Sequence, residues 1–277
     1  MSLTVKAYAK INLFLDITGR LPNGYHTLNT VMQQIDLYDN VRVSRTDGEI
    51  TVTCNNPNIP CNEKNIAYRA AAAFFAESGI RGGAEIDIEK NIPLEAGLGG
   101  SSTDGAAVLT ALNMLCGEPL SVGQLCAVGA SLGADVPFCL TGGTAVCGGT
   151  GEKIRSIPCK KDFFIVIAKP DFYCNTTQAY KKFDMSPLPV REGFDRFVGL
   201  LENGCEAWSG MVYNVFEQLY RDKRIEAATN ELKEKGALCA ALSGSGSAVF
   251  GVFSDENKAK KAAESINLPF CRMINPI

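Results

Sequence analysis

The sequence predicts an α+β protein, because strand-like and helix-like segments are interspersed without the regular alternation of a parallel βαβ sheet. The first 55 residues are mainly β-prone, and alanine-rich helical patterns follow them. With 277 residues, 46% of them apolar, the chain can bury a large core and is long enough for two domains. The segment from 148 to 161 is rich in Gly, Pro and charge, so we expect domains at 1–155 and 156–277.

The N-terminal half should begin with strands that are broken by one turn. Arg20 to His26 contains Pro-Asn-Gly, a strong turn signal between two β-prone segments. The apolar patterns predict strands at 3–9, 11–18, 41–43, 50–52, 84–89 and 142–146, and helices at 64–77, 104–116 and 122–132.

The C-terminal half mixes both kinds of element. Its patterns predict strands at 163–168, 237–242 and 248–253, and helices at 176–183, 211–219 and 224–234. No repeat of fixed period is present.

Composition argues against several classes of partner. The net charge is −3, and the Lys and Arg residues are scattered, so we expect neither a nucleic-acid nor a membrane partner. The N-terminus lacks a signal-peptide core, and the longest apolar runs are too short to span a bilayer. Eleven cysteines without a CxxC pair exclude a complete disulfide set and a typical zinc site. This usage fits a reducing compartment, so we expect a cytoplasmic protein.

The most informative motif is PLEAGLGGSSTDGAA, which runs from Pro93 to Ala107. Its glycines allow backbone conformations that turn several N–H groups toward one point. Ser101, Ser102 and Thr103 are expected to supply hydroxyls and the N-cap of the following helix. The positive end of that helix would then face the same point. This combination predicts an anion site, and a nucleotide phosphate is the anion that it fits best.

Two better-known phosphate loops do not fit this motif. A Walker A loop requires Gly-Lys, a dipeptide that the sequence lacks. A dinucleotide fingerprint requires a third glycine where Ser102 stands, and a strongly apolar strand before the loop. The alternative to a phosphate site is a flexible surface turn before a capped helix.

Two charged residues lie in apolar surroundings. Lys10 interrupts a β-prone run, and Asn12 follows on the same strand face. Its amine must either reach solvent or meet an anion. Asp135 follows Gly133-Ala134 and precedes the apolar Val136-Pro137-Phe138, where it is either a partner for a cation such as Lys10 or an ordinary aspartate at a helix C-terminus or in a turn.

His26 is the only histidine in the chain, and Tyr25 precedes it. An aromatic ring beside an imidazole could stack on a planar base and hydrogen-bond its edge. The alternative is an exposed loop histidine. A second glycine turn, SGSGS at 243–247, is either another backbone anion nest or a tight hairpin.

The order of these motifs resembles the GHMP kinase superfamily. The match rests on PLEAGLGGSSTDGAA, on SGSGSAVFGVF late in the chain and, more specifically, on AKINLFLDITGRLPNGYH and GADVPFCLTGG. The resemblance implies a two-domain α+β fold with the active site in the cleft between the domains. It also implies ATP as cosubstrate, with Mg²⁺, and a small-molecule acceptor, a methylerythritol that carries a cytidine diphosphate and is phosphorylated at its 2-hydroxyl.

The resemblance also implies roles for individual residues. Lys10 and Asp135 would form the catalytic pair, in which Asp135 takes the hydroxyl proton and Lys10 stabilises negative charge. Asn12, Tyr25, His26 and Tyr180 would bind the substrate. The residues implied to contact ATP are Asn65, Pro93, Leu94, Glu95, Ala96, Gly97, Leu98, Gly99, Gly100, Ser101, Ser102 and Thr103.

The sequence departs from the family pattern in two places. Ser101 replaces a glycine and Gly105 replaces an alanine, so the phosphate loop could differ locally. No carboxylate is evident as a ligand for Mg²⁺, an ion that often keeps its waters and binds mainly through phosphates.

Two other functions compete with the expected one: a related kinase for mevalonate, homoserine or a sugar, and a nucleotide-binding protein without catalysis. Tyr25 and His26 argue against the first, and the presence of both Lys10 and Asp135 argues against the second.

Overall fold

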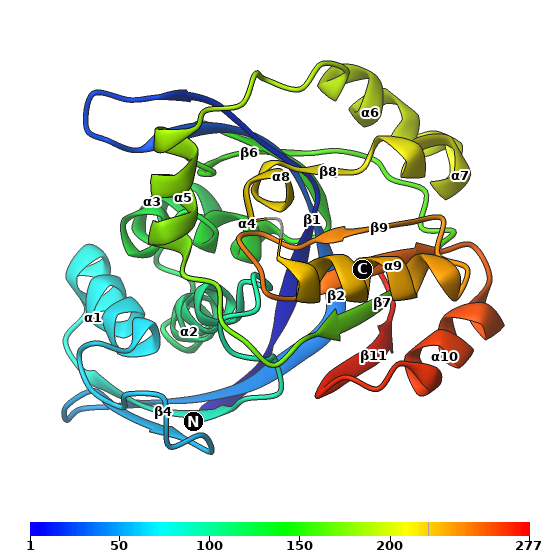
Figure 1. The fold of residues 1–277 in the computed structure, drawn as a ribbon. Helices are drawn as coiled ribbons and strands as arrows, with labels where there is room; N and C mark the ends of the chain where they lie inside the picture. The colour runs from blue at the N-terminus through cyan, green and yellow to red at the C-terminus, as the bar shows by residue number, and fades with distance from the viewer. Residues whose placement is uncertain (221) are drawn as a thin grey trace. The chain divides into compact units, whose positions relative to one another are not determined.

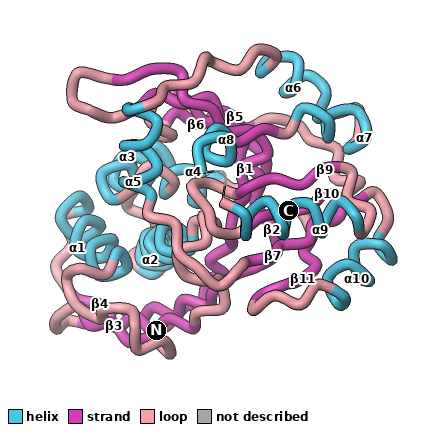
Figure 2. Tube along the Cα trace, viewed as in Figure 1, coloured by secondary structure: helices cyan, strands magenta, loops and turns pink. Residues whose placement is uncertain are grey.

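A computed structural model, which describes residues 1–220 and 222–277, contains both long strands and packed helices (Figures 1 and 2). The α+β class is therefore confirmed. By the density of contacts, the chain divides into two compact units, each assembled from segments that are distant in sequence. The first unit comprises Met1–Ala9, Leu37–Ile92 and Gly99–Gly142, and the second comprises Lys10–Asp36, Pro93–Leu98 and Gly143–Ile277.

Two long strands, β1 (Ser2–Arg20) and β2 (His26–Thr46), contribute residues to both units. They replace the separate short strands that the sequence predicts, because strand conformation continues through the polar positions between them. The predicted turn is confirmed between Arg20 and His26, where Gly24 has a φ of 87° and the Leu21 N–H donates to the Tyr25 carbonyl.

In the first unit, β2 pairs antiparallel with β4 (Gly83–Glu89), and β4 pairs in parallel with β3 (Thr51–Cys54). Apolar residues alternate along β4, so one face of this sheet is buried. The helices of this unit are α1 (Ile66–Ser78), α2 (Gly100–Leu115), α3 (Val122–Leu132) and α4 (Val136–Thr141).

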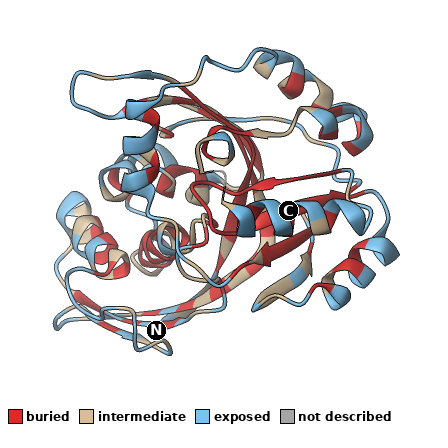
Figure 3. Cartoon of the chain, in the orientation of Figure 1, coloured by how far each residue is buried: buried red, intermediate tan, exposed pale blue. Residues whose placement is uncertain are grey.

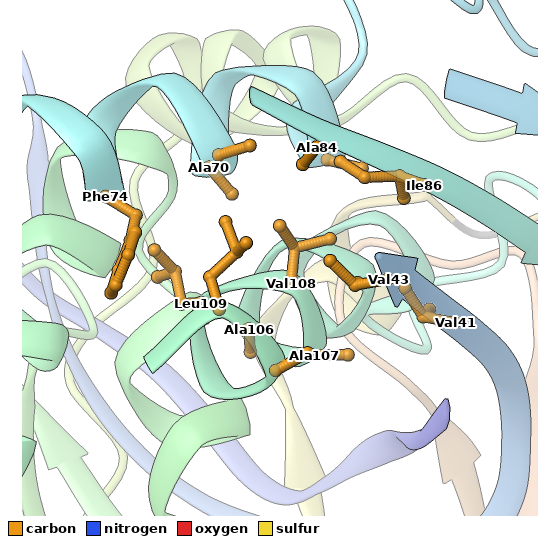
Figure 4. Packing of buried hydrophobic residues seen from close by; sticks show 14 of the residues in the cluster. Val41, Val43, Ala70, Phe74, Ala84, Ile86, Ala106, Ala107, Val108 and Leu109 are labelled. Atoms are coloured by element: carbon orange, nitrogen blue, oxygen red, sulfur yellow. The ribbon is translucent and has the colours of Figure 1, made fainter. Parts of the chain in front are cut away.

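The core of the first unit lies between this sheet and the helices α1 and α2 (Figure 4). Phe74 and Ala70 of α1 meet Leu109 and Val108 of α2, and Ile86 of β4 closes the same cluster. Small alanines on both helices allow them to approach closely. This packing fixes the position of the α2 N-terminus, to which the glycine motif is attached.

In the second unit, four antiparallel strands form a sheet in the order β11-β7-β10-β9. Figure 3 shows buried strands beneath the helices α9 and α10, whose outer sides are exposed. Elsewhere in this unit β5 pairs with β2 and β6, and β8 pairs in parallel with β1. The strands are β5 (Thr144–Gly148), β6 (Lys153–Ser156), β7 (Phe164–Lys169), β8 (Tyr213–Asn214), β9 (Cys239–Leu242), β10 (Val249–Phe253) and β11 (Phe270–Ile274).

The helices of the second unit differ in part from the predicted set. Helices near 176–183 and 224–234 are confirmed, whereas α6, α7, α10 and the strand β11 were not predicted. The helices are α5 (Thr176–Met185), α6 (Phe194–Leu200), α7 (Cys205–Trp208), α8 (Val215–Tyr220), α9 (Lys223–Glu234) and α10 (Glu256–Ser265). Two 3₁₀ turns, Leu201–Asn203 and Ser209–Met211, adjoin α7.

The predicted helix at 211–219 is wrong in its first half, because Asn214 is extended. The Asn214 amide nitrogen donates to the carbonyls of Leu242 (2.7 Å) and Gly244 (2.8 Å), and its side-chain oxygen accepts from the Phe216 N–H. These bonds keep residues 213–214 paired with β1, and α8 begins only after them.

All eleven cysteines are free thiols. Within the described residues, no helix combines the length and the apolar character that a membrane crossing needs.

Candidate active site

The glycine motif has the backbone geometry that the sequence predicts. Gly97 and Gly99 have φ values of 73° and 74°, in the left-handed region that other residues rarely adopt. Ser101 lies inside α2, where its φ is negative, so its replacement of a family glycine is tolerated.

The predicted N-cap is wrong. Helix α2 begins at Gly100, so Ser101, Ser102 and Thr103 lie within its first turn rather than before it. Its N-cap residue is Gly99, which supplies no side-chain hydrogen bond, and the Thr103 hydroxyl instead donates to the Tyr8 carbonyl (2.8 Å). The first N–H groups of this 16-residue helix thus lack a capping side chain at Gly99, which leaves the helix end suited to an anion.

Gly105, the second departure from the family pattern, has a packing explanation. A Cβ at this position would lie 3.1 Å from Cγ1 of Ile66, which is tighter than ordinary contact. The glycine therefore lets α1 and α2 approach more closely than an alanine would.

The second glycine turn, 243–247, is a tight turn between β9 and β10 rather than an open anion nest. Four of its five N–H groups donate to acceptors within the protein: Ser243 to Ala248 O, Gly244 to Asn12 Oδ1, Gly246 to Ser243 O and Ser247 to Glu95 O. The turn also supports the glycine motif directly, because the Ser243 hydroxyl donates to the Gly97 carbonyl (3.0 Å). Its role is thus structural support of residues 95–97.

Lys10 is buried, with 4% of its surface exposed, so the alternative that it reaches solvent is wrong. Its Nζ donates to Asn12 Oδ1 (2.9 Å), which confirms that the two side chains share a strand face. The same oxygen accepts from the Gly244 N–H (3.1 Å), and Asn12 Nδ2 donates to the Thr30 hydroxyl (2.9 Å). Because every polar atom of this amide has a partner, Asn12 holds the Lys10 ammonium in one place.

Asp135 occupies the N-cap position of α4, with a φ of −84°, and is partly buried. Its backbone carbonyl accepts from the Cys139 N–H (3.1 Å), so it starts a helix rather than ending one. Asp135 belongs to the first unit and Lys10 to the second. The catalytic pairing of these two residues stays a prediction.

His26 is buried, so the alternative of an exposed loop histidine is wrong. Its Nε2 lies 2.7 Å from Oδ1 of Asp184, and its ring stacks on Tyr180 with centroids 4.9 Å apart and planes 27° apart. A carboxylate only accepts hydrogen bonds, so Nε2 carries a proton. The guanidinium of Arg20 lies 3.6 Å from the other carboxylate oxygen of Asp184. The structure thus brings together His26 and Tyr180, two of the predicted substrate residues.

Tyr25 and Asn65 are the remaining predicted contacts. Tyr25 is 65% exposed and stands in the turn beside His26. Asn65 is the N-cap of α1, where its oxygen accepts from the Ala67 N–H (2.9 Å) and its amide donates to the Pro60 carbonyl (2.8 Å). Its position is therefore explained by capping, and its contact with adenine stays a prediction.

Two further features, one in each unit, were not predicted from sequence. Asp184 lies 158 positions after His26, and no local pattern marks it as a partner. A buried cluster of Lys90, Asp39 and Asp104 lies beside the start of α2. Lys90 lies three positions before Pro93, the first residue of the glycine motif, and this proximity was the only available signal.

The comparisons with known proteins agree with the motifs. The GHMP kinases N terminal domain matches residues 65–143, and the GHMP kinases C terminal domain matches residues 220–270. A relative from Clostridium botulinum (strain Alaska E43 / Type E3), named 4-diphosphocytidyl-2-C-methyl-D-erythritol kinase, is 42% identical over 95% of both chains. This chain belongs to that kinase family. The predicted boundary at 155 falls between the two matched segments and stays a prediction.

Solved structures place the same family in the same fold. A crystal structure of 4-(cytidine 5'-diphospho)-2C-methyl-D-erythritol kinase is 29% identical, has a TM-score of 0.82 and covers 99% of each chain. A homoserine kinase from Cytophaga hutchinsonii is 20% identical with a TM-score of 0.77, covering 99% of this chain and 94% of its own, which shows the shared fold alone. The predicted two-domain GHMP kinase fold is thus confirmed.

Proposed function

We propose that this protein transfers the γ-phosphoryl group of ATP to the 2-hydroxyl of 4-(cytidine 5'-diphospho)-2-C-methyl-D-erythritol, a step of the non-mevalonate route to isoprenoid precursors. Membership of the kinase family, at 42% identity over 95% of the chain, carries the assignment of activity. The observation that supports the acceptor is the buried His26, which Asp184 and Tyr180 hold in one orientation.

The His26 arrangement suits recognition of cytosine. Because Nε2 donates to Asp184, neutral His26 presents a lone pair at Nδ1. That lone pair can accept from the exocyclic amine of cytosine. Tyr25, exposed beside His26, offers an aromatic face on which the base can stack. Mevalonate and homoserine carry no base and would leave these groups unused.

Lys10 and Asp135 supply the chemistry in this proposal. Asp135 accepts the proton of the attacking hydroxyl, and the Lys10 ammonium stabilises the charge that develops on the transferred group. The bond from Lys10 to Asn12 supports this role, because it fixes the ammonium before substrate binds. Asn12 acts on the substrate through Lys10 in this account.

ATP binding is assigned to residues 93–103 and Asn65. The uncapped start of α2 and the left-handed glycines Gly97 and Gly99 support a phosphate site there. Mg²⁺ would accompany ATP and neutralise phosphate charge. The described residues contain no group of three or more histidine, cysteine or carboxylate side chains suited to a metal ion.

The cellular location also remains part of the proposal. Eleven free thiols fit a reducing compartment, and we expect the enzyme in the cytoplasm with small molecules as its partners.

Measuring ATP consumption with different acceptors tests this function. We expect turnover with the cytidyl-diphosphate acceptor and only background with mevalonate or homoserine. Turnover with mevalonate or homoserine but not with the cytidyl compound would refute the assignment of substrate. Absence of turnover with every acceptor would favour a nucleotide-binding protein without catalysis.

The variant His26→Ala sharpens the same assay. It should raise the KM for the cytidyl acceptor at least about tenfold, because a buried polar recognition pair is lost, and leave the KM for ATP unchanged. An equal loss toward both substrates would mean that His26 has a structural role only.

A further inference from the structure

Lys90 is a buried lysine in the first unit to which no predicted role applies. Its side chain is 4% exposed, and its ammonium donates to the carboxylates of Asp39 and, at 2.7 Å, of Asp104. The side chain of Asp39 is fully buried and that of Asp104 is 6% exposed. Two carboxyl groups and one ammonium are therefore enclosed inside the unit.

This cluster binds the backbone on both sides of the phosphate loop. Asp39 Oδ1 accepts the N–H groups of Asn91 (2.5 Å) and Ile92 (2.8 Å), which lead into the loop. The Lys90 ammonium also donates to the carbonyl of Gly100 (3.4 Å), the first residue of α2. The two ends of the loop are thus attached to one set of charges.

Packing at Gly100 shows how closely these ends meet. A Cβ at Gly100 would lie 3.2 Å from Cγ2 of Ile92 and 3.4 Å from the Lys90 ammonium. Glycine therefore allows the start of α2 to rest against Lys90 and Ile92. The chain leaves this point at Ile92 and returns to it at Gly100.

The cluster is not arranged for the greatest stability. Burial, with a further contribution from Asp39, raises the pKa of Asp104 to about 7 although Lys90 opposes the shift. One oxygen of Asp104 is buried without a hydrogen-bond partner among the described residues. Burial alone would lower the pKa of Lys90, but Asp104 and Asp39 raise it. Apolar side chains often replace buried ion pairs without loss of stability, so the bonds of this cluster to the loop ends are its more specific contribution.

We propose that Lys90, together with Asp39 and Asp104, is a positioning residue that closes the phosphate loop and thereby sets the affinity for ATP. The inference rests on the proposed function of that loop as the ATP site. Lys90 itself touches the loop backbone, and its effect on ATP is exerted through the placement of the glycine N–H groups.

We call the bonds from Lys90 and Asp39 to the two ends of the loop the clamp. Two variants remove it in different ways. Lys90→Met deletes the ammonium and keeps most of the side-chain length, but it leaves two buried carboxylates unbalanced. Lys90→Met/Asp104→Asn removes one positive and one negative charge together, so it should fold even where the single variant does not. Phe74→Leu, a fully buried change in the α1 part of the same core, is the control for general destabilisation.

Amide hydrogen exchange without ATP and calorimetric binding of a non-hydrolysable ATP analogue give the readouts. We expect exchange across 91–103 to become at least about tenfold faster in the clamp variants, and analogue binding to weaken at least about tenfold. The KM for the cytidyl acceptor should stay within about twofold of wild type. Phe74→Leu should change neither the loop exchange nor analogue binding.

The outcomes separate this inference from the proposed function. A folded double variant with wild-type exchange across 91–103 and wild-type analogue binding would overturn the clamp. Equal weakening toward the analogue and the acceptor would also overturn it, because that result indicates general damage. If the wild-type protein does not bind the analogue, the proposed ATP site is refuted, and with it the effect of Lys90 on ATP affinity. Faster loop exchange in the variants would then still support closure of the loop by Lys90.

Discussion

Lys10 and Asn12 show how one amide can fix a charged group. Asn12 Oδ1 accepts from both the Lys10 ammonium and the Gly244 N–H, and its nitrogen donates to Thr30. A flip of the amide would place a donor against both of those donors, so the orientation is determined. The ammonium is therefore held in place by the protein itself, and in the proposed role of Lys10 this would lower the cost of reorganisation during phosphoryl transfer.

Asp135→Asn tests the other half of the proposed catalytic pair. The variant keeps the size of the side chain and its N-cap position on α4 but cannot accept the hydroxyl proton. We expect kcat to fall at least about 10²-fold while both KM values change little, as for loss of a general base. Steady-state kinetics with both substrates measure this, and a rate close to wild type would remove Asp135 from the role.

At the scale of elements, two glycine-containing segments of the second unit, 93–98 and 243–247, support each other. The N–H groups of Ser247 and Ala248 donate to the carbonyls of Glu95 and Ala96. The Ser243 carbonyl lies where a side chain on Gly97 would be, 2.0 Å from an added Cβ. The composition of the sequence indicates both the glycine motif and the turn at 243–247. It does not indicate that the turn supports the glycine motif.

Gly97→Ala should therefore be severely destabilising. The change combines a left-handed φ of 73° with overlap against the Ser243 backbone. We expect the free energy of unfolding to fall by about 2–5 kcal/mol, measured by urea denaturation. Gly199→Ala is the matched control, since it lies in α6 with no atom within 4 Å of the added Cβ. It should be neutral or stabilising, and a similar loss in both variants would contradict the packing explanation.

At the scale of the whole molecule, patterns with a local cause were predictable. The helix at 122–132 follows from its apolar periodicity and its Ser121 capping box, and the Pro-Asn-Gly turn follows from its composition. The partners of His26 were not predictable, because Asp184 belongs to a helix 158 positions away. Asn214 overrides a helical pattern through bonds to Leu242 and Gly244, which likewise depend on tertiary structure.

The same distinction applies to the candidate site. The glycine motif, Lys10 and His26 stand out because each conflicts with its local surroundings. Lys90, Asp39 and Asp104 attract no attention in sequence, since each is an ordinary charged residue: Lys90 follows the end of β4, Asp39 lies inside β2 and Asp104 lies near the start of α2. Their burial arises only when β2, β4 and α2 are assembled.

The position of the new phosphate on the product tests the central claim most directly. The account predicts transfer to the 2-hydroxyl, whose carbon carries a methyl group and no hydrogen. Proton-coupled ³¹P NMR of the reaction with ATP and the cytidyl acceptor should therefore show a new phosphomonoester signal without three-bond coupling to hydrogen. A signal split by one or two protons would place the phosphate on another hydroxyl, and no new signal beyond hydrolysed ATP would contradict the kinase assignment itself.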